Sequence, residues 1–336
     1  MSSSIFTSTT LAAYGFGGRL TADFPSQVMV DVTEICNLAC VHCPHPQFKK
    51  SEHYGARNLD PELNHKMVEE VRDHGKGCTQ FIRYTSNGEP LVHPQIYDML
   101  EDAVEHSGAF VTLTTNGTIL NAQRVEKLLA SGLHLIDISI DAFNESTYAQ
   151  IRVGGKLETT RAHVIRLLQI RASIKAKTKI IISFVEQPQN MNEVENFKKF
   201  WRDQGADQVI IRRLHSSAGE VKNIALDLND RIADIQRRPC LYPWERVALT
   251  AKGNLTFCPQ DWVHGSVIAN YRDTTIREIW QGEFYRGLRE AHLKNHFSQH
   301  IFCGQCPDWA TTRWPGEEGC SYADMVENFN NLKPIS

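Results

Sequence analysis

The stretch EICNLACVHCPHP (residues 34–46) directly follows the apolar run QVMVDVT (27–33), so that a cysteine-rich loop comes straight after a predicted strand. It places Cys36, Cys40 and Cys43 in one short loop. Three thiols are too few for a closed zinc site, and an odd number leaves a disulfide scheme incomplete. A cubane iron–sulfur cluster held by three thiolates would keep one iron open for a small molecule. The alternatives are a half zinc site completed by distant cysteines, or unrelated buried thiols.

A strand-then-helix pattern repeats over the first two thirds of the chain. Its strand candidates are the short β-branched runs QVMVDVT (27–33), TQFIRYTS (79–86), AFVTLTT (109–115), LHLIDISID (133–141), KIIISFVE (179–186) and DQVIIRRL (207–214). Such runs are typical of parallel strands that are buried on both faces. With right-handed crossovers, six β/α units predict an α/β fold, a partial (β/α)6 TIM-like barrel.

Polar loops follow the strand candidates at their C-terminal ends. The three-cysteine loop follows the first and SNGEP (86–90) the second, while TTNG (114–117) ends the third and SIDA (139–142) ends the fourth. Barrel folds place their chemistry at this end of the strands. Gly and Asn could simply mark turns there. Four such loops at one face, with a thiol cluster among them, favour a functional site.

The composition excludes several classes of protein. The chain has 336 residues, a formal net charge of -3 and no basic tract, so nucleic acid is not expected as a partner. The N-terminus lacks the pattern of a signal peptide, and no apolar stretch approaches the ~20 residues of a membrane span. We expect a cytoplasmic protein. In that reducing compartment its 9 cysteines favour metal ligands or reactive thiols over disulfides.

Cysteines return in the C-terminal third, after residue 230. They are Cys240, Cys258, Cys303, Cys306 and Cys320. KGNL (252–255) reads as a tight turn between the strands ERVALTA (245–251) and NLTFC (254–258). This hairpin would bring Cys240 and Cys258 to the same end as the later C-x-x-C. On spacing alone, a four-cysteine zinc ribbon competes with an iron–sulfur cluster.

The CxxxCxxC loop after the first strand resembles the signature of radical S-adenosylmethionine (SAM) enzymes, and the resemblance extends over the six-unit region. It implies that Cys36, Cys40 and Cys43 hold a [4Fe-4S] cluster whose open iron is chelated by the amino and carboxylate groups of SAM. It further implies reductive cleavage of SAM to a 5′-deoxyadenosyl radical, which abstracts hydrogen from a substrate carbon.

The same resemblance implies a set of SAM-contacting residues. They are His42 beside the adenine, Asn87, Gly88 and Glu89 at the amino group, Asn116, Ser139 at the ribose or carboxylate, Asp141, and Arg152 at the carboxylate. Asn87 departs from the family pattern, which has glycine there. Asp141 could equally cap the following turn, and Arg152 could cap a helix end.

The C-terminal third resembles the SPASM/twitch extension of this family. The shorter twitch form implies one auxiliary [4Fe-4S] cluster on Cys240, Cys258, Cys303 and Cys306; the longer SPASM form needs more cysteines than the chain offers. The spacing of Cys303, Cys306 and Cys320 is also similar to the three-cysteine cluster of the molybdopterin-precursor cyclase. We therefore expect an N-terminal arm (1–25), a core barrel (26–230) and an auxiliary-cluster domain (231–336).

The resemblance also limits the reaction. Twitch-bearing relatives include an aminocyclitol dehydrogenase and aminoglycoside or sugar epimerases, whereas related SPASM proteins modify peptides or protein side chains. Cys36 lies too close to the start of the sequence to leave room for the leader-binding domain that peptide maturases usually carry. We expect a small polar substrate of sugar, aminocyclitol or nucleoside type, and an electron donor such as flavodoxin or ferredoxin.

Two chemistries remain open for that substrate. We expect oxidation of a carbinol, with the electron passing to the auxiliary cluster; the alternative is epimerisation with Cys320 as hydrogen-atom donor. Cys320 could also be a cluster ligand or a buried apolar residue. Arg212 and His215 end the sixth strand as acid/base or substrate-binding candidates, and His215 is the better base because arginine stays protonated. A zinc-binding interaction module without enzymatic activity is a remote alternative.

Overall fold

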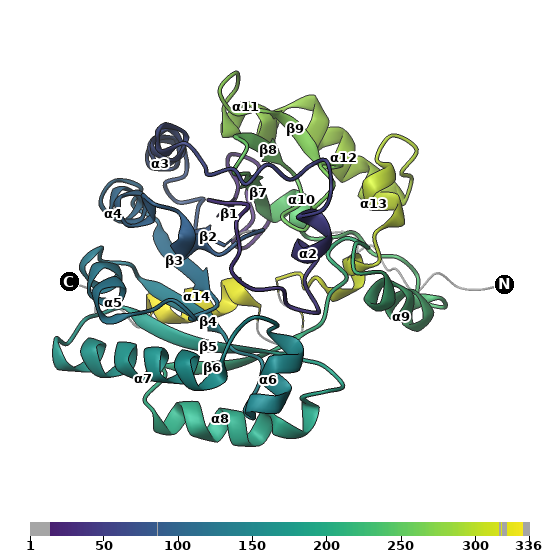
Figure 1. Cartoon of the computed structure of the whole chain (residues 1–336). Helices are drawn as coiled ribbons and strands as arrows, with labels where there is room; N and C mark the ends of the chain where they lie inside the picture. The colour runs from purple at the N-terminus through teal and green to yellow at the C-terminus, as the bar shows by residue number, and fades with distance from the viewer. Residues whose placement is uncertain (1–13, 86, 316, 318–320, 332–336) are drawn as a thin grey trace.

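A nine-stranded sheet forms the centre of the protein, in the order β6-β5-β4-β3-β2-β1-β7-β8-β9 (Figure 1). The computed structural model describes residues 14–85, 87–315, 317 and 321–331. The strands are β1 (Gln27–Val30), β2 (Phe81–Tyr84), β3 (Phe110–Thr115), β4 (Leu135–Ser139), β5 (Lys179–Glu186), β6 (Gln208–Arg213), β7 (Arg246–Leu249), β8 (Asn254–Thr256) and β9 (Val267–Asn270). All neighbouring pairs from β1 to β6 are parallel, which confirms the predicted part-barrel.

Helices connect the barrel strands and pack on the outer face of the sheet. They are α3 (Pro61–His74), α4 (Ile96–His106), α5 (Ala122–Ala130), α6 (Glu145–Ile151), α7 (Leu157–Ser173) and α8 (Val194–Asp203). The loops contain the short helices α2 (His45–Phe48), η1 (Pro90–Val92) and η2 (Met191–Glu193), and α2 packs against Trp262 of the C-terminal third. Local sequence sets their starts: the Asp60 carboxylate accepts a hydrogen bond from the backbone N–H of Glu62, and Asn121 caps α5 in the same way.

The C-terminal third is helical apart from strands β7, β8 and β9. Its elements are α9 (Lys222–Ile232), α10 (Tyr242–Glu245), α11 (Ile276–Gln281), α12 (Glu283–Lys294), α13 (Ile301–Gln305), η3 (Asp308–Thr311) and α14 (Tyr322–Asn331). Thr275 and Glu278 form a capping box at the start of α11. Within the described part of the chain, no helix is long and apolar enough to cross a membrane.

The predicted hairpin exists, but it does not stand apart from the barrel. Strand β7 pairs antiparallel with β8 and, on its other edge, parallel with β1. Residue Asp31, just beyond β1, continues this contact by donating its backbone N–H to the carbonyl of Leu249. The first strand therefore ends earlier than predicted, and the C-terminal third extends the barrel sheet through β7, β8 and β9.

Side chains that point into the barrel form layers of different polarity. The lowest layer holds Phe81, Phe110, Leu135 and Ile181, which pack with apolar residues of α14. Two positions further along each strand, the inward side chains are polar. They include Arg83, Asp137, Ser183 and Arg212. Helix α14, yellow in Figure 1, thus closes one end of the barrel with an apolar contact.

Candidate active site

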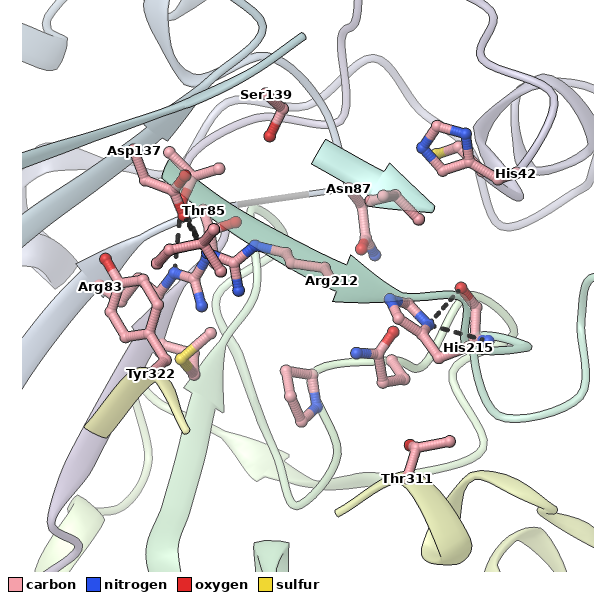
Figure 2. Close-up of a pocket in the computed structure, with 18 of the residues that line it drawn as sticks. His42, Arg83, Thr85, Asn87, Asp137, Ser139, Arg212, His215, Thr311 and Tyr322 are labelled. Carbon is pink, nitrogen blue, oxygen red and sulfur yellow. Dashed lines mark hydrogen bonds and ion pairs between the residues drawn. The ribbon is translucent and has the colours of Figure 1, made fainter. Parts of the chain in front are cut away.

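A cavity of about 770 Å³ occupies the barrel above the apolar layer. Most of the residues predicted for the SAM and cluster site line it. They are Cys36, Cys40, His42, Cys43, Asn87, Gly88, Glu89, Asn116, Ser139, Arg152, Arg212 and His215. Several of them come from the C-terminal ends of different strands, and Figure 2 shows His42, Asn87, Ser139, Arg212 and His215 around one space. The predicted residues are therefore neighbours in space although 179 positions separate Cys36 from His215.

The three thiols of the loop after β1 lie in a setting that disfavours free thiolates. Burial raises the pKa of Cys36 to about 11 and that of Cys43 to about 12. The backbone N–H of His45 donates to Cys43 Sγ at 3.5 Å, and Arg152 Nη1 donates to Cys40 Sγ at 3.7 Å. Metal ions deprotonate buried thiols, and such N–H donors support thiolate ligands. The loop therefore fits the three-thiolate cluster that the sequence predicts.

Gly88 is required by a close backbone approach. A Cβ atom at this position would lie 2.4 Å from the carbonyl oxygen of Ile35 and 2.5 Å from that of Thr33. The neighbouring Glu89 N–H donates to the same Ile35 carbonyl at 2.8 Å. The loop after β2 is thus held directly against the cluster loop, which explains why the SNGEP segment needs a glycine there.

Glu89 is a buried carboxylate that joins two strand ends. Its Oε1 accepts from Thr115 Oγ1 at 2.6 Å and from the backbone N–H of Leu91 at 3.1 Å, while Oε2 accepts from the N–H of Asn116 at 2.8 Å. Burial raises the pKa of the carboxyl group, and these donors lower it. Asn116 in turn donates to Asn37 Oδ1 at 2.9 Å. Glu89 and Asn116 therefore hold the β3 end against the cluster loop as well as lining the cavity.

Asp141 does not line the large cavity; it contacts Arg152, which does. Its side chain is fully buried, accepts from Arg152 Nε at 2.8 Å and accepts from the N–H of Val185 at 2.8 Å. It also lies 3.5 Å from His42 Nε2. Asp141 therefore orients Arg152 and His42, and its direct contact with SAM stays a prediction.

His42 and the remaining predicted SAM residues are fixed by neighbouring elements. His42 Nδ1 lies 3.2 Å from Gln187 Nε2, and burial lowers the pKa of the ring to about 4, which keeps it neutral. Asn87 donates from Nδ2 to the carbonyl of Asp261 at 3.3 Å, and Ser139 ends β4 at the cavity. His42, Asn87 and Ser139 all line the large cavity, and their contacts with SAM stay predictions.

A second, smaller cavity of about 30 Å³ lies among the C-terminal cysteines. Cys240, Cys258, Cys303 and Cys306 all line it, as the hairpin argument predicted. Burial raises the pKa of Cys240 to about 11 and that of Cys306 to about 12. Among the described residues, no group of three or more His, Cys, Asp or Glu side chains converges on a single-ion site. Cys320 falls outside the described residues, so its three predicted roles, as hydrogen-atom donor, cluster ligand or buried apolar residue, stay predictions.

Two unpaired buried donors face the auxiliary cysteines. His292 Nδ1 accepts from the backbone N–H of Cys240 at 3.4 Å, so the neutral ring carries its proton on Nε2. That Nε2 is buried without a hydrogen-bond partner among the described residues, and so is Arg237 Nε. Both side chains line the small cavity. Cluster sulfurs accept hydrogen bonds, so these orphaned donors fit a cluster on the four cysteines.

We expect His292→Phe to lower the reduction potential of the auxiliary cluster. Burial lowers the pKa of His292 to about 3, so the ring is a neutral donor at pH 7. Hydrogen bonds to cluster sulfurs raise the potential, and Phe removes the donor while keeping an aromatic ring beside Trp244. An anaerobic redox titration followed by electron paramagnetic resonance (EPR) measures the shift. His296→Phe, an exposed change just after α12, is the control; an unchanged potential in His292→Phe contradicts the assignment.

The two cavities share a wall. Tyr242, Gln260 and Asp308 line both of them. Asp308 is fixed by the loop after β6, since Ser216 donates to it through its N–H at 2.8 Å. His215 lies in the same loop and is exposed to the large cavity, with Nδ1 3.3 Å from the N–H of Ser217. The cavity among the auxiliary cysteines is thus separated from the large cavity by this shared wall.

Sequence reasoning missed several polar residues that line the large cavity. They are Asp31 after β1, Arg83 in β2, Asp137 in β4 and Tyr322 in α14. A signal was present for two of them, because Arg83 and Asp137 are charged residues at inward positions of otherwise apolar strands. Nothing in the local sequence of α14 indicates that its first residue enters the barrel.

Asp31→Asn should stabilise the protein more at pH 8 than at pH 5. Burial raises the Asp31 pKa well above its usual value, although the N–H of Asn87 lowers it. The unfolded carboxyl ionises near pH 4, so the wild type loses stability as pH rises, by about 1.4 kcal/mol per unit of pKa shift. Asn removes this loss. Anaerobic thermal melting at both pH values tests the prediction, and an equal gain at pH 5 and pH 8 contradicts it.

Comparison with protein families identifies the class. A profile of the Radical SAM superfamily matches residues 30–200, and a profile described as an iron-sulfur cluster-binding domain (SPASM) matches residues 240–307. The chain belongs to the radical SAM superfamily. It is an enzyme that uses SAM with a SAM-binding [4Fe-4S] cluster, and the match over its C-terminal part favours auxiliary iron–sulfur chemistry there over the zinc ribbon and the zinc-binding interaction module.

Curated relatives cover different activities within this superfamily. The AdoMet-dependent heme synthase of Methanosarcina barkeri is 33% identical over 141 residues, which are 42% of this chain and 38% of that protein. The GTP 3′,8-cyclase of Peptoclostridium acidaminophilum is 31% identical over 54% of this chain and 52% of its own. Mycofactocin maturase MftC of Mycolicibacterium smegmatis is 28% identical over 72% of this chain and 56% of its own. The matched part of the chain thus covers between 38% and 56% of the length of each of these relatives.

Solved structures share the fold at low sequence identity. BtrN in complex with AdoMet and 2-DOIA superposes with a TM-score of 0.58 at 18% identity, covering 84% of this chain and 92% of BtrN. SuiB of Streptococcus suis bound to precursor peptide SuiA gives a TM-score of 0.63 at 15% identity, covering 91% of this chain and 73% of SuiB. These similarities confirm the architecture of a radical SAM barrel with a C-terminal extension.

Proposed function

We propose that this enzyme oxidises a carbinol carbon of a small polar substrate of sugar, aminocyclitol or nucleoside type. The observation that carries the proposal is the wall of Tyr242, Gln260 and Asp308, which the large cavity and the auxiliary cysteine cavity share. Oxidation of a substrate radical needs a nearby one-electron acceptor, whereas epimerisation does not. A cysteine site directly behind the substrate cavity favours oxidation.

The cofactor chemistry starts the reaction. Bound SAM and the cluster on Cys36, Cys40 and Cys43 supply a 5′-deoxyadenosyl radical that abstracts hydrogen, and the cluster on the four C-terminal cysteines supplies an electron acceptor. The protein's own part is orientation: we assign Arg152, fixed by Asp141, to the SAM carboxylate. His42 and Ser139 would hold the adenosine part, and Glu89 the amino group.

His215 is our candidate for accepting the substrate proton. It is exposed to the cavity, whereas Arg212 stays protonated and cannot act as a base. In the observed arrangement Nδ1 accepts from the N–H of Ser217 at 3.3 Å, so Nε2 carries the proton. To act as a base, the ring must turn and release this contact. A hydrogen bond of this length is weak, so its loss costs little.

The size and polarity of the cavity support a small substrate. Its volume of about 770 Å³ lies within the range of ordinary ligand sites, and SAM must share it. Its walls carry hydroxyl, amide and charged groups such as Thr85, Asn87 and Ser139. Peptide modification is the second candidate, favoured by the match to MftC over 72% of this chain. Epimerisation with Cys320 as hydrogen donor is the third.

Further parts of the proposal concern the surroundings of the enzyme. We propose a core domain over residues 26–230 and an auxiliary-cluster domain over 231–336, preceded by an arm over 1–25. A small electron-transfer protein such as flavodoxin or ferredoxin would reduce the enzyme. A reducing cytoplasm would keep the cysteines free to bind iron.

A deuterium experiment tests the proposed reaction. The reconstituted enzyme is incubated with SAM, dithionite and carbinol-deuterated sugars, aminocyclitols and nucleosides, and the products are analysed by mass spectrometry. Oxidation predicts deuterium in 5′-deoxyadenosine and a product two mass units lighter than the unlabelled substrate. A product that keeps the substrate's composition and gains one hydrogen isotope from solvent contradicts oxidation and supports epimerisation.

A further inference from the structure

We infer that Arg83 and Arg212 form an anion-binding site at the floor of the large cavity, which binds a carboxylate or phosphate group of the substrate. The inference rests on the proposed function, because it specifies the class of small polar substrate. Both side chains line the cavity, and Figure 2 shows them converging on Asp137 beside Tyr322. The floor lies directly above the apolar layer that α14 covers.

The charges at this floor do not balance. Asp137 Oδ2 accepts from Arg212 Nη2 at 2.6 Å and from Arg83 Nη2 at 3.2 Å, while Ser183 donates to Oδ1. One carboxylate therefore faces two guanidinium groups. The neighbouring Arg246 is already paired with Glu245, so it neither adds to nor removes the excess. One positive charge at the floor therefore lacks a counter-ion among the residues that the structure describes.

Each of the two arginines has one nitrogen left for a ligand. Arg83 uses Nε and Nη2 on Thr114 and Asp137, and Arg212 uses Nε on Ser183 and Nη2 on Asp137. No hydrogen bond from either Nη1 is formed within the described part of the chain. The two side chains keep exposures of 15% and 27%, and they line the cavity. Two pairs of N–H groups are thus available to one anionic group.

The arrangement is held rigid before any ligand binds. The centroid of the Tyr322 ring lies 3.8 Å from Cζ of Arg83 and 5.5 Å from Cζ of Arg212. Such stacking fixes the plane of a guanidinium and leaves its edge free for an anion. Asp137 holds the second edge of both groups. A preorganised guanidinium pair suits carboxylate or phosphate oxygens, which accept charge-assisted hydrogen bonds.

The position of the site gives it a function in the reaction. It lies inside the barrel, whereas the thiols of the cluster loop lie at the C-terminal strand ends. A substrate anchored by its anionic group at the floor would extend toward the loop. The distance between the anionic group and the oxidised carbon would then select among substrates.

Calorimetric titration tests the site without turnover. The reconstituted, SAM-bound enzyme is titrated with inorganic phosphate and, separately, with acetate, in the absence of reductant. We expect saturable binding that weakens about tenfold or more in Arg212→Gln, since a charged donor pair is lost. Asp137→Asn should instead bind phosphate more tightly, because it removes the competing carboxylate. Arg202→Gln makes the same charge change on an exposed residue of α8 and should bind like the wild type.

The outcomes separate this inference from its alternatives. Stronger binding of phosphate than of acetate indicates a phosphorylated substrate, and the reverse indicates a carboxylic acid. Equal phosphate affinity in the wild type and Arg212→Gln, or weaker phosphate binding in Asp137→Asn, contradicts the anion-binding site. Arg83, Asp137 and Arg212 would then form only a structural ion network. Phosphate binding by an enzyme that fails to oxidise any carbinol would refute the proposed function and keep the anion site.

Discussion

Cys40→Ala is expected to reduce SAM cleavage to background, a fall of roughly three orders of magnitude. Cys40 is buried in the loop after β1 and lies within hydrogen-bond distance of Arg152, so it joins the thiol loop to the residue assigned to the SAM carboxylate. Removal of one of three thiolates should release this cluster and about four irons per chain. Anaerobic assays of 5′-deoxyadenosine formation and of iron content measure both effects.

Cys78→Ala is the matched control for this prediction. Cys78 is a half-buried thiol at the start of the second β/α unit, where it contacts Thr21. Its replacement makes the same chemical change outside both cavities, so iron content and SAM cleavage should stay at wild-type values. SAM cleavage by Cys40→Ala at a rate close to that of Cys78→Ala contradicts the assigned ligands.

Cys306→Ala is expected to separate SAM cleavage from substrate oxidation. It should lose about four irons per chain, keep reductive cleavage of SAM, and form no oxidised product. The reason is the geometry of the two cavities, which share Tyr242, Gln260 and Asp308 but have separate sets of cysteines. Loss of the auxiliary thiolate removes the electron acceptor without disturbing the loop after β1.

Product and iron analysis of Cys306→Ala tests whether the auxiliary cluster accepts the substrate electron and whether Cys306 is one of its ligands. Iron content and 5′-deoxyadenosine are measured beside the oxidised product, with Cys78→Ala again as the control. Full oxidation by a Cys306→Ala enzyme that has lost its auxiliary iron contradicts the proposed electron transfer. Wild-type iron content in this variant would instead show that Cys306 is not a ligand.

Much of the barrel could be predicted because each parallel strand carries its own signal. Runs such as KIIISFVE are apolar on both faces, and this pattern does not depend on distant residues. The cluster loop was equally clear, since Cys36, Cys40 and Cys43 are close in sequence as well as in space. The gathering of SNGEP, TTNG and SIDA at one face followed from the direction of parallel strands.

The features that sequence reasoning missed are long-range contacts. The pairing of β7 with β1 joins residues 219 positions apart, such as Gln27 and Arg246, and no local pattern specifies it. The entry of Tyr322 into the barrel depends on packing of α14 against the lowest layer. The burial of Asp141 behind Arg152 depends on a positive φ of 64° at Asp141, which turns the chain after β4. Such arrangements arise from tertiary packing rather than from local propensity.

The most direct test of two separate cluster sites is the triple variant with Cys36, Cys40 and Cys43 all changed to Ala. Iron content is measured after anaerobic reconstitution, and the EPR spectrum of the reduced protein is recorded with and without SAM. The account predicts about four irons per chain and a spectrum that SAM does not change, because the remaining cluster is fully ligated by four cysteines. A triple variant without iron, or with a spectrum that responds to SAM, contradicts the account.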